Sequence, residues 1–188
     1  MKKIETTLQD AYIIEANVFG DHRGFFMESY NKEAFKKIGI DIEFIQDNHS
    51  LSEAKGTLRG LHYQLEPKTQ TKLVRCTRGA ILDVIVDVRK GSPTYGKWEA
   101  FELTAENKKQ LFIPKGFLHG YYTLTENCEV QYKVDEYYAA DCDRSVKWND
   151  ETLAIDWQIS TPPVLSAKDE KAVSFVEMDN NFVYEESK

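Results

Sequence analysis

Strict alternation of polar and apolar side chains is the feature that most constrains how this chain can fold. In residues 129–135 every odd position is polar, so Val130, Tyr132 and Val134 lie on one face of an extended strand. A strand with one apolar face must bury that face against other elements of the protein. The pattern therefore predicts a sheet in which Tyr132 points inward.

Residues 82–88 repeat the same period. Their even positions are apolar and their odd face carries Asp83 and Asp87, which predicts a half-buried strand. Further strands are expected at 12–14, 25–27, 44–49, 98–103 and 111–113, separated by glycine and proline turns. Many short strands of this kind are typical of a sandwich or a barrel.

Helices are expected only near the two ends. Residues 31–38 favour a short helix with Asn31 as its N-cap. Residues 166–177 favour a second one, because Ser166 and Asp169 have the spacing of a capping box.

Composition and charge exclude several classes of protein. The net charge of −7 argues against broad binding of nucleic acid or anionic membranes. No run approaches the roughly 20 apolar residues of a membrane span. The three cysteines lack CxxC spacing, which indicates neither a disulfide framework nor a zinc knuckle. No apolar stretch follows the basic residues near Met1, so a cytoplasmic location is expected. Without repeats or linkers, residues 1–188 are expected to form one domain, with a frayed tail from about residue 178.

The stretch Leu58–Gln64 places a guanidinium and an imidazole three positions apart. In an extended strand Arg59 and His62 would point to opposite faces, and a bend at Gly60 would bring both to one cavity. His62 is then a candidate catalytic base, and the alternative is a histidine satisfied by hydrogen bonds in the core.

Lys72 and Tyr132 could complete such a site. Lys72 shares strand parity with Val74 and Cys76, so it is expected to point inward unless it snorkels at the strand end. A neutral imidazole can remove a proton α to a carbonyl, and an ammonium can stabilise the enolate oxygen. A tyrosine can return a proton from the opposite face. Together these groups predict an epimerisation.

The segment Ile113–Gly120 reads Pro-x-Gly-x-x-His after an apolar strand and resembles the second signature of the cupin superfamily of small β-barrels. In many cupins the residue at the position of His119 binds a metal. The first cupin signature needs a His-x-His pair, whereas Gln64 follows His62 here. A metal-dependent cupin enzyme is therefore an alternative, with two further histidines as substitute ligands, His22 and His49.

Nine ordered segments, covering the chain from about residue 10 to 170, resemble the dTDP-4-dehydrorhamnose 3,5-epimerase family. They are Gly20–Phe26, Gln46–Ser50, Leu58–Gln64, Lys72–Arg75, Pro114–Gly120, Tyr132–Lys133, Tyr137–Tyr138, Trp148–Asp150 and Leu165–Asp169. The resemblance implies an all-β fold, a cupin-type double-stranded β-helix (jelly-roll) barrel with short flanking helices. It also implies a homodimer that needs no metal or organic cofactor. The substrate would be dTDP-4-dehydro-6-deoxy-D-glucose, inverted at C3 and C5 to dTDP-4-dehydro-L-rhamnose in dTDP-L-rhamnose biosynthesis.

Roles for individual residues follow from the same resemblance. His62 matches the base, Asp169 the carboxylate that orients it, Tyr132 the general acid, and Lys72 the group that holds the enolate oxygen. Tyr138 matches an aromatic side chain that stacks on the thymine. Positions that match the nucleotide and diphosphate site are Arg23, Glu28, Gln46, Asp47, Asn48, Arg59, His119 and Lys168.

Asp143 departs from the family pattern, because many members have the longer glutamate at this substrate-contacting position. Arg144 beside it adds a charge where some members have glycine. Two function classes remain open besides the metal-dependent cupin. A mono-epimerase would use the same base and acid, and a silent sugar-nucleotide binding module would have no need for a His–Asp pair together with Tyr132.

Overall fold

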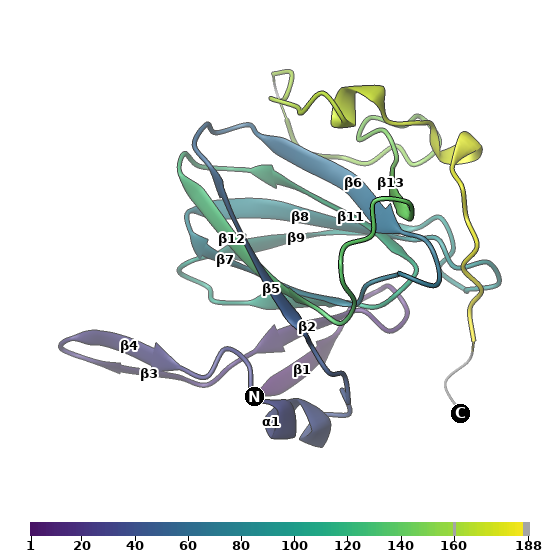
Figure 1. Ribbon diagram of the computed structural model, residues 1–188. Helices are drawn as coiled ribbons and strands as arrows, with labels where there is room; N and C mark the ends of the chain where they lie inside the picture. The colour runs from purple at the N-terminus through teal and green to yellow at the C-terminus, as the bar shows by residue number, and fades with distance from the viewer. Residues whose placement is uncertain (160, 186–188) are drawn as a thin grey trace.

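The computed structural model describes residues 1–159 and 161–185, and its strands form two facing antiparallel sheets and a projecting hairpin (Figure 1). The six-stranded sheet has the order β1 (Lys2–Glu5), β2 (Tyr12–Glu15), β10 (Gln110–Ile113), β7 (Lys72–Arg78), β12 (Cys128–Val134), β5 (Gln46–Ser52). The five-stranded sheet has the order β13 (Asp143–Ser145), β6 (Leu58–Gln64), β11 (Phe117–Thr123), β8 (Ala80–Asp87), β9 (Trp98–Thr104). The hairpin pairs β3 (Val18–Asp21) with β4 (Gly24–Met27). The predicted all-β class is confirmed.

The main core lies between the two sheets. Val74 of β7 and Ile85 of β8 are completely buried in it, and Val130 of β12 is 1% exposed. Tyr132 packs against the same cluster, so the inward face predicted from the alternation in β12 is confirmed. Because the cluster draws on strands far apart in sequence, it fixes the two sheets relative to one another.

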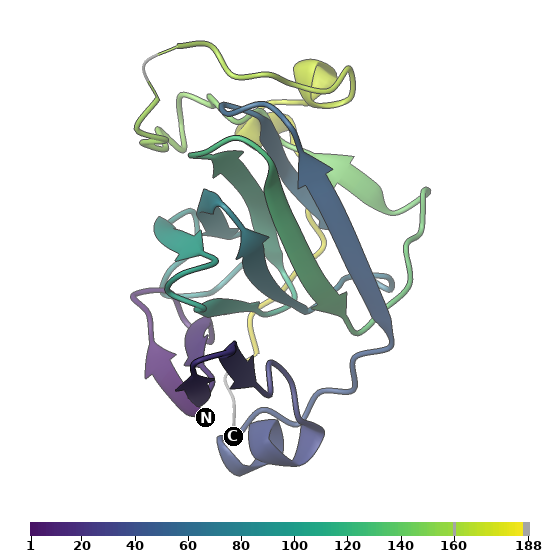
Figure 2. The same ribbon diagram turned by 90° about the vertical axis from the view of Figure 1, so that its left-hand side faces the viewer.

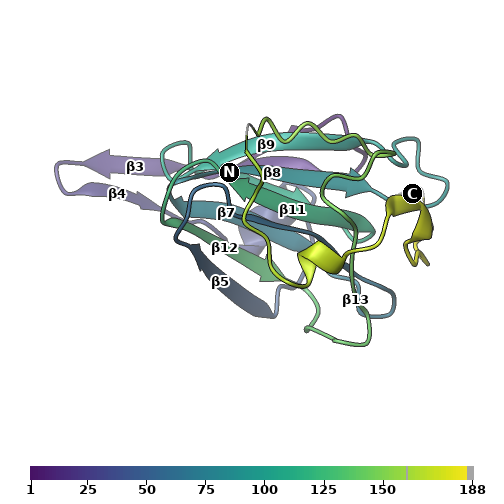
Figure 3. The same cartoon turned by 90° about the horizontal axis from the view of Figure 1, so that it is seen from above.

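Strand β8 is buried on both faces, so the prediction of a half-buried strand is wrong. Asp83 and Asp87 are 0% exposed, as is Val84 on the opposite face. The C-terminal segment, whose backbone runs across β8 and β11 in Figure 3, supplies the missing cover. Trp157 and other residues of this segment share one buried cluster with the even side chains of β8. The odd face points between the sheets, where both carboxylates have hydrogen-bond partners. Asp87 accepts from Arg89 and Ser92, and Asp83 lies 3.1 Å from His119.

The N-terminal helix forms where the sequence predicts it. Helix α1 spans Lys32–Lys37, and the Asn31 side chain accepts a hydrogen bond of 3.1 Å from the Ala34 amide. Figure 2 shows α1 beside the N-terminal strands, at the opposite end of the molecule from the two short helices of the C-terminal segment.

The C-terminal segment contains two single-turn 3-10 helices, η1 (Asp169–Lys171) and η2 (Phe175–Glu177), instead of the one helix predicted over 166–177. The chain is extended at Ala172, and Val173 pairs as an isolated bridge with the residue that follows β13. This pairing interrupts the helix because its backbone groups bond to another segment.

The predicted frayed tail from about residue 178 is also wrong for the residues that the structure describes. Phe182 is 4% exposed and packs edge-on against Tyr63, and Val183 bridges Lys90. Residues 186–188 of that expected tail lie outside the described residues. Within 1–159 and 161–185, no helix is long and apolar enough to cross a membrane.

Candidate active site

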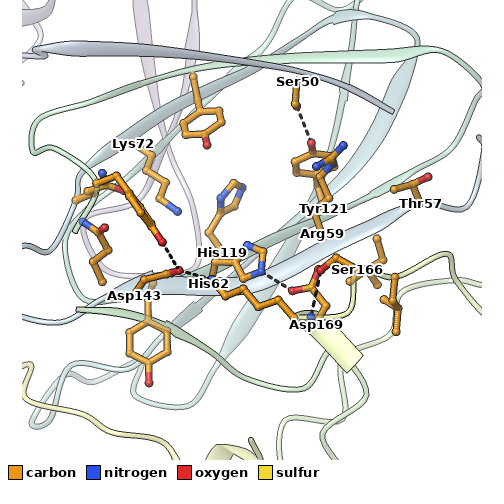
Figure 4. A pocket seen from close by; sticks show the side chains of 18 of the residues that line it. Ser50, Thr57, Arg59, His62, Lys72, His119, Tyr121, Asp143, Ser166 and Asp169 are labelled. Carbon is orange, nitrogen blue, oxygen red and sulfur yellow. Dashed lines mark hydrogen bonds and ion pairs between the residues drawn. The ribbon is translucent and has the colours of Figure 1, made fainter. Parts of the chain in front are cut away.

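A cavity of about 460 Å³ lies between the two sheets and is closed on one side by the C-terminal segment (Figure 4). Its wall contains all four candidate catalytic residues, His62, Lys72, Tyr132 and Asp169. Five of the candidate binding residues also line it: Arg59, His119, Tyr138, Asp143 and Lys168. The fold thus gathers side chains that lie more than a hundred positions apart.

A bulge at Gly60 directs two of these side chains into the cavity. His62 lies opposite His119 and Arg59 opposite Tyr121, so the register shifts by one residue between them. Gly60 has φ +125°, and a Cβ atom there would lie 2.5 Å from the Gly120 Cα. Only glycine fits at this position, and the predicted bend that brings Arg59 and His62 to one cavity is confirmed.

His62 forms a close pair with a carboxylate. Its Nε2 lies 2.5 Å from Oδ1 of Asp169, and the Ser166 hydroxyl donates to the other oxygen at 2.9 Å. Burial raises the pKa of Asp169. The hydrogen bond and charge of His62 and the hydrogen bond of Ser166 outweigh this effect, so the pKa lies below its usual value. An ionised carboxylate only accepts, so Nε2 carries the proton. The remaining nitrogen, Nδ1, is therefore free to take a proton.

Lys72 and Tyr132 lie on the sheet that faces His62. Burial lowers the pKa of Lys72 to about 8, and the charges of Asp83 and Asp143 offset part of that effect. Burial raises the pKa of Tyr132, so its hydroxyl stays protonated at neutral pH and can donate. His62 and Tyr132 come from opposite sheets, and a ligand between them would meet one on each side.

Three side chains at one edge of the cavity form a hydrogen-bonded group. Asp143 accepts from the Lys168 ammonium and, at 3.2 Å, from the Tyr138 hydroxyl. Although Asp143 is shorter than the glutamate of many family members, its carboxylate still reaches Lys168 and Tyr138. Arg144 points away from the cavity and donates to Asp179 at 2.9 Å. This ion pair links β13 to the C-terminal segment.

Two predicted binding residues do not reach the cavity. Arg23 lies in the turn of the β3–β4 hairpin, which projects from the body in Figure 1, and its guanidinium donates to Asp21 at 2.5 Å. Glu28 follows the hairpin and accepts from Asn31 at 3.3 Å. Neither belongs to the cavity wall that contains His62.

Three further candidates lie on the edge strand β5. Gln46 donates to Asn48 at 2.8 Å, and Asp47 on the outer face pairs with Lys133 at 2.8 Å. Asp47 and Asn48 line a second, smaller cavity of about 290 Å³, which shares Tyr132 with the first. Asp47 and Asn48 are therefore connected to the first cavity through the shared Tyr132, and none of the three residues lines it.

The histidines do not converge on one point. His49 lies 3.0 Å from Glu129 on the outside of β5, and His22 lies in the hairpin turn. His119 pairs with Asp83. Across residues 1–159 and 161–185, no three His, Cys, Asp or Glu side chains are placed to hold a metal ion.

Several residues of the site had no clear signal in the sequence. Asp83 lies 3.1 Å from Nε2 of His119, and the Tyr121 hydroxyl lies 2.9 Å from Ser50. Asp83 interrupts a nearly continuous apolar run, and a reading of β8 as buried on both faces would have identified it. Nothing in the local pattern distinguishes Ser50 or Tyr121.

Comparisons with known proteins agree on one family. The family model described as dTDP-4-dehydrorhamnose 3,5-epimerase matches residues 5–177. The Shigella flexneri protein of that name is 50% identical over 180 residues, covering 95% of this chain and 98% of the relative.

Solved structures give the same result. The Legionella pneumophila enzyme RmlC, in complex with dTDP-4-keto-L-rhamnose, is 42% identical with a TM-score of 0.94, covering 98% of this chain and 99% of the other. The Bacillus anthracis enzyme with TDP and PPi bound is 52% identical with a TM-score of 0.90, covering 93% and 99%. The predicted cupin-type jelly-roll barrel is thereby confirmed, and this chain belongs to the dTDP-4-dehydrorhamnose 3,5-epimerase family.

Proposed function

We propose that this protein converts dTDP-4-dehydro-6-deoxy-D-glucose to dTDP-4-dehydro-L-rhamnose by inverting C3 and C5, a step of dTDP-L-rhamnose biosynthesis. The observation that carries this proposal is the placement of a base and an acid on opposite sheets, His62 on β6 and Tyr132 on β12. Such a pair can remove a proton from one face of a sugar ring and return one to the other.

Each inversion uses three side chains in sequence. Nδ1 of His62 takes the proton from the carbon next to the C4 carbonyl, and the electron pair moves onto the carbonyl oxygen. The Lys72 ammonium stabilises this enolate oxygen. Tyr132 then donates its hydroxyl proton to the opposite face of the carbon. Proton exchange with solvent restores the neutral imidazole and the phenol before the second inversion.

Asp169 fixes the imidazole for this task. Because its carboxylate accepts from Nε2, it orients the ring with Nδ1 unprotonated and stabilises the imidazolium that forms. Around the reacting sugar, Arg59 and Lys168 provide cationic groups suited to a diphosphate, and the exposed Tyr138 provides a ring on which thymine can stack.

Solvent exchange tests this function directly. In deuterated water, with the 4-keto sugar nucleotide as substrate, the enzyme should introduce deuterium at both C3 and C5 of the product. Exchange at one carbon alone would identify a mono-epimerase instead. His62→Ala should abolish turnover while dTDP affinity barely changes, and retained turnover would refute the base assignment. A silent binding module would show no exchange at all.

We also propose that the protein acts as a homodimer. Phe19, Phe25 and Phe26 of the β3–β4 hairpin are 61–67% exposed. Such a projecting apolar arm is typical of an interface with another chain. A second copy that receives this arm would bring Arg23 and Glu28 to the nucleotide end of the partner's cavity, which explains why they do not reach their own.

Mixed subunits test this arrangement. Arg23→Ala and His62→Ala each impair a homodimer, but a mixed dimer contains one cavity with both native residues. Mixing the two variants after partial unfolding should therefore restore part of the turnover. If the mixture stays as inactive as its components, the arm does not complete a partner's site. The three cysteines are free thiols, which suits the cytoplasmic location we propose.

A further inference from the structure

Gln64 stands where the first cupin signature has its second histidine, and the proton transfers at His62 and Tyr132 do not use it. It lies two residues after His62 on β6, so both side chains leave the same face of the strand and line the catalytic cavity. Gln64 is only 5% exposed. A buried primary amide must find hydrogen-bond partners, and these partners show what the side chain does.

The Gln64 amide holds the main chain on both sides of Tyr138. Its Nε2 donates to the Tyr137 carbonyl at 3.2 Å, and its Oε1 accepts from the Ala139 amide at 2.7 Å. The second hydrogen of Nε2 goes to the Lys68 carbonyl at 2.6 Å. Both donor hydrogens and the acceptor oxygen are therefore engaged, and the side chain takes the place that a peptide group of a neighbouring strand would have.

Tyr138 needs such support because it lies in an irregular loop. Residues 137–139 belong to neither a helix nor a strand. Tyr138 is 64% exposed, so packing contributes little to its position. A loop without anchors would lose conformational freedom when a ligand binds, and that loss weakens affinity. The hydrogen bonds of Gln64 restrict the loop before a ligand arrives.

The hydroxyl end of Tyr138 has an anchor of its own. It donates to Asp143 at 3.2 Å, and Asp143 is the direct partner of Gln64 across the β6–β13 ladder. Two residues that face each other in one ladder thus hold Tyr138 at its main chain and at the end of its ring. The exposed surface of the ring stays available to a ligand in the cavity.

We propose that Gln64 is a positioning residue for the nucleobase. Its amide holds Tyr138 in the orientation in which the ring stacks on thymine, before the dTDP sugar arrives. This role rests on the proposed epimerase function, in which Tyr138 carries the base, and it adds a residue that sets how tightly the nucleotide binds. The position of a metal ligand in many cupins thereby anchors a loop in this chain.

Gln64→Met removes all three hydrogen bonds at nearly constant side-chain length. The two ends of the loop keep attachments that do not involve this side chain. Before the loop, Gln70 donates to the Glu136 carbonyl at 2.8 Å. After it, the Leu65 amide donates to the Cys142 carbonyl at 3.0 Å. The variant should therefore fold, with a looser chain between these two attachments.

The loss should appear in the binding of the base and not in that of the diphosphate. If the Tyr138 ring keeps its stacking position for about a tenth of the time, the affinity of Gln64→Met for dTDP falls about tenfold in calorimetry. Binding of inorganic pyrophosphate, which has no base, should barely change. With the 4-keto sugar nucleotide, KM should rise more than kcat falls, because stacking on the base acts on ground state and transition state alike. An equal loss for dTDP and pyrophosphate would overturn the proposal.

A double-mutant cycle tests whether Gln64 acts through Tyr138. Tyr138→Ala should weaken dTDP binding by about 5- to 150-fold, the range for the loss of one base–aromatic stack. In that background Gln64→Met should cause no further loss, because no ring remains to be positioned. A full additional loss would mean that Gln64 acts elsewhere, and the proposal would be wrong.

Asn180→Leu is the matched control. The Asn180 side chain also holds main chain, since it donates to the Val88 carbonyl at 2.7 Å and accepts from the Phe182 amide at 2.9 Å. It lies outside the wall of the catalytic cavity. This variant should lower the melting temperature without changing the affinity for dTDP. A loss of dTDP affinity equal to that of Gln64→Met would contradict a specific role for Gln64.

Hydrogen exchange in the unmodified protein provides a test even if Gln64→Met does not fold. The Ala139 amide should exchange slowly without ligand and change little when dTDP is added, because the loop is already in place. Fast exchange, or protection that appears only with dTDP, overturns the proposal. Neither dTDP binding nor hydrogen exchange requires turnover. Absence of deuterium at C3 and C5 would therefore refute the epimerase function alone, whereas unchanged dTDP binding in Gln64→Met would refute the role of Gln64 alone.

Discussion

Replacing Gly60 by alanine should damage both stability and catalysis, because the bulge that positions His62 leaves no room for a Cβ atom. The added atom would lie 2.5 Å from the Gly120 Cα and 2.7 Å from the His119 carbonyl oxygen. Both neighbours are backbone atoms of the paired strand, so neither can move away as the end of a flexible side chain could. The two strands must separate locally.

The size of the effect has two parts. A side chain at a positive φ costs about 1–2 kcal/mol, and overpacking against fixed backbone costs about 1–3 kcal/mol more. The free energy of unfolding should therefore fall by about 2–5 kcal/mol. For a chain of this length this corresponds to a melting temperature lower by about 4–20 °C. A displacement of His62 by about 1 Å should reduce kcat by about a hundredfold.

Gly91→Ala provides the matched control. Gly91 has φ +88°, but a Cβ atom there would meet nothing within 4 Å. This variant should lose only the conformational part, about 1–2 kcal/mol, and keep full activity. Urea unfolding and steady-state turnover of both variants measure the difference. Equal destabilisation of the two variants, or full activity of Gly60→Ala, would refute the close-approach argument.

Three further predictions concern other contacts. Asp169→Asn should reduce kcat by about 10³–10⁴-fold with little change in KM, because the amide can present its NH₂ group to His62 and reverse the tautomer; a loss below tenfold in steady-state kinetics would argue against the orienting role. Asp143→Asn should tighten dTDP binding severalfold in calorimetry, because it frees Lys168 from a competing carboxylate, and unchanged or weaker binding would count against that competition. Phe182→Ala should lower the free energy of unfolding by about 3–5 kcal/mol in urea titrations, and no change would mean that the end of the chain does not pack as described.

Much of the fold could be predicted because its determinants are local. The alternation in β12, the cap at Asn31 and the glycine in β6 each fix a short piece of backbone within a few residues. β8 is different, since its two buried faces depend on a C-terminal segment far away in sequence. The same applies to residues 166–177, where the pairing of Val173 with Val146 replaces the helix that the local pattern favours.

The candidate site shows the same division. The inward orientations of Lys72 and Tyr132 follow from strand parity, and both line the cavity. The pairing of His62 with Asp169 came only from the family resemblance, because nothing local links the two residues. The sequence predicts that Asp83 lies on a polar face of its strand. Its partner His119 lies on another strand, so nothing local reveals the pairing that buries it. Five predicted binding residues do not line this cavity in the single chain: Arg23, Glu28, Gln46, Asp47 and Asn48.

The dependence of His62 on a carboxylate 107 positions later has a consequence during synthesis of the chain. At about 5–20 residues per second, His62 leaves the ribosome about 5–20 s before Asp169. In that interval the strands from β6 to β12 can begin to pair, while the imidazole still lacks its orienting group. A nascent or prematurely ended chain is thus expected to be a barrel with an unoriented base. Activity toward a reactive keto sugar begins only when the last part of the chain has closed over the sheet.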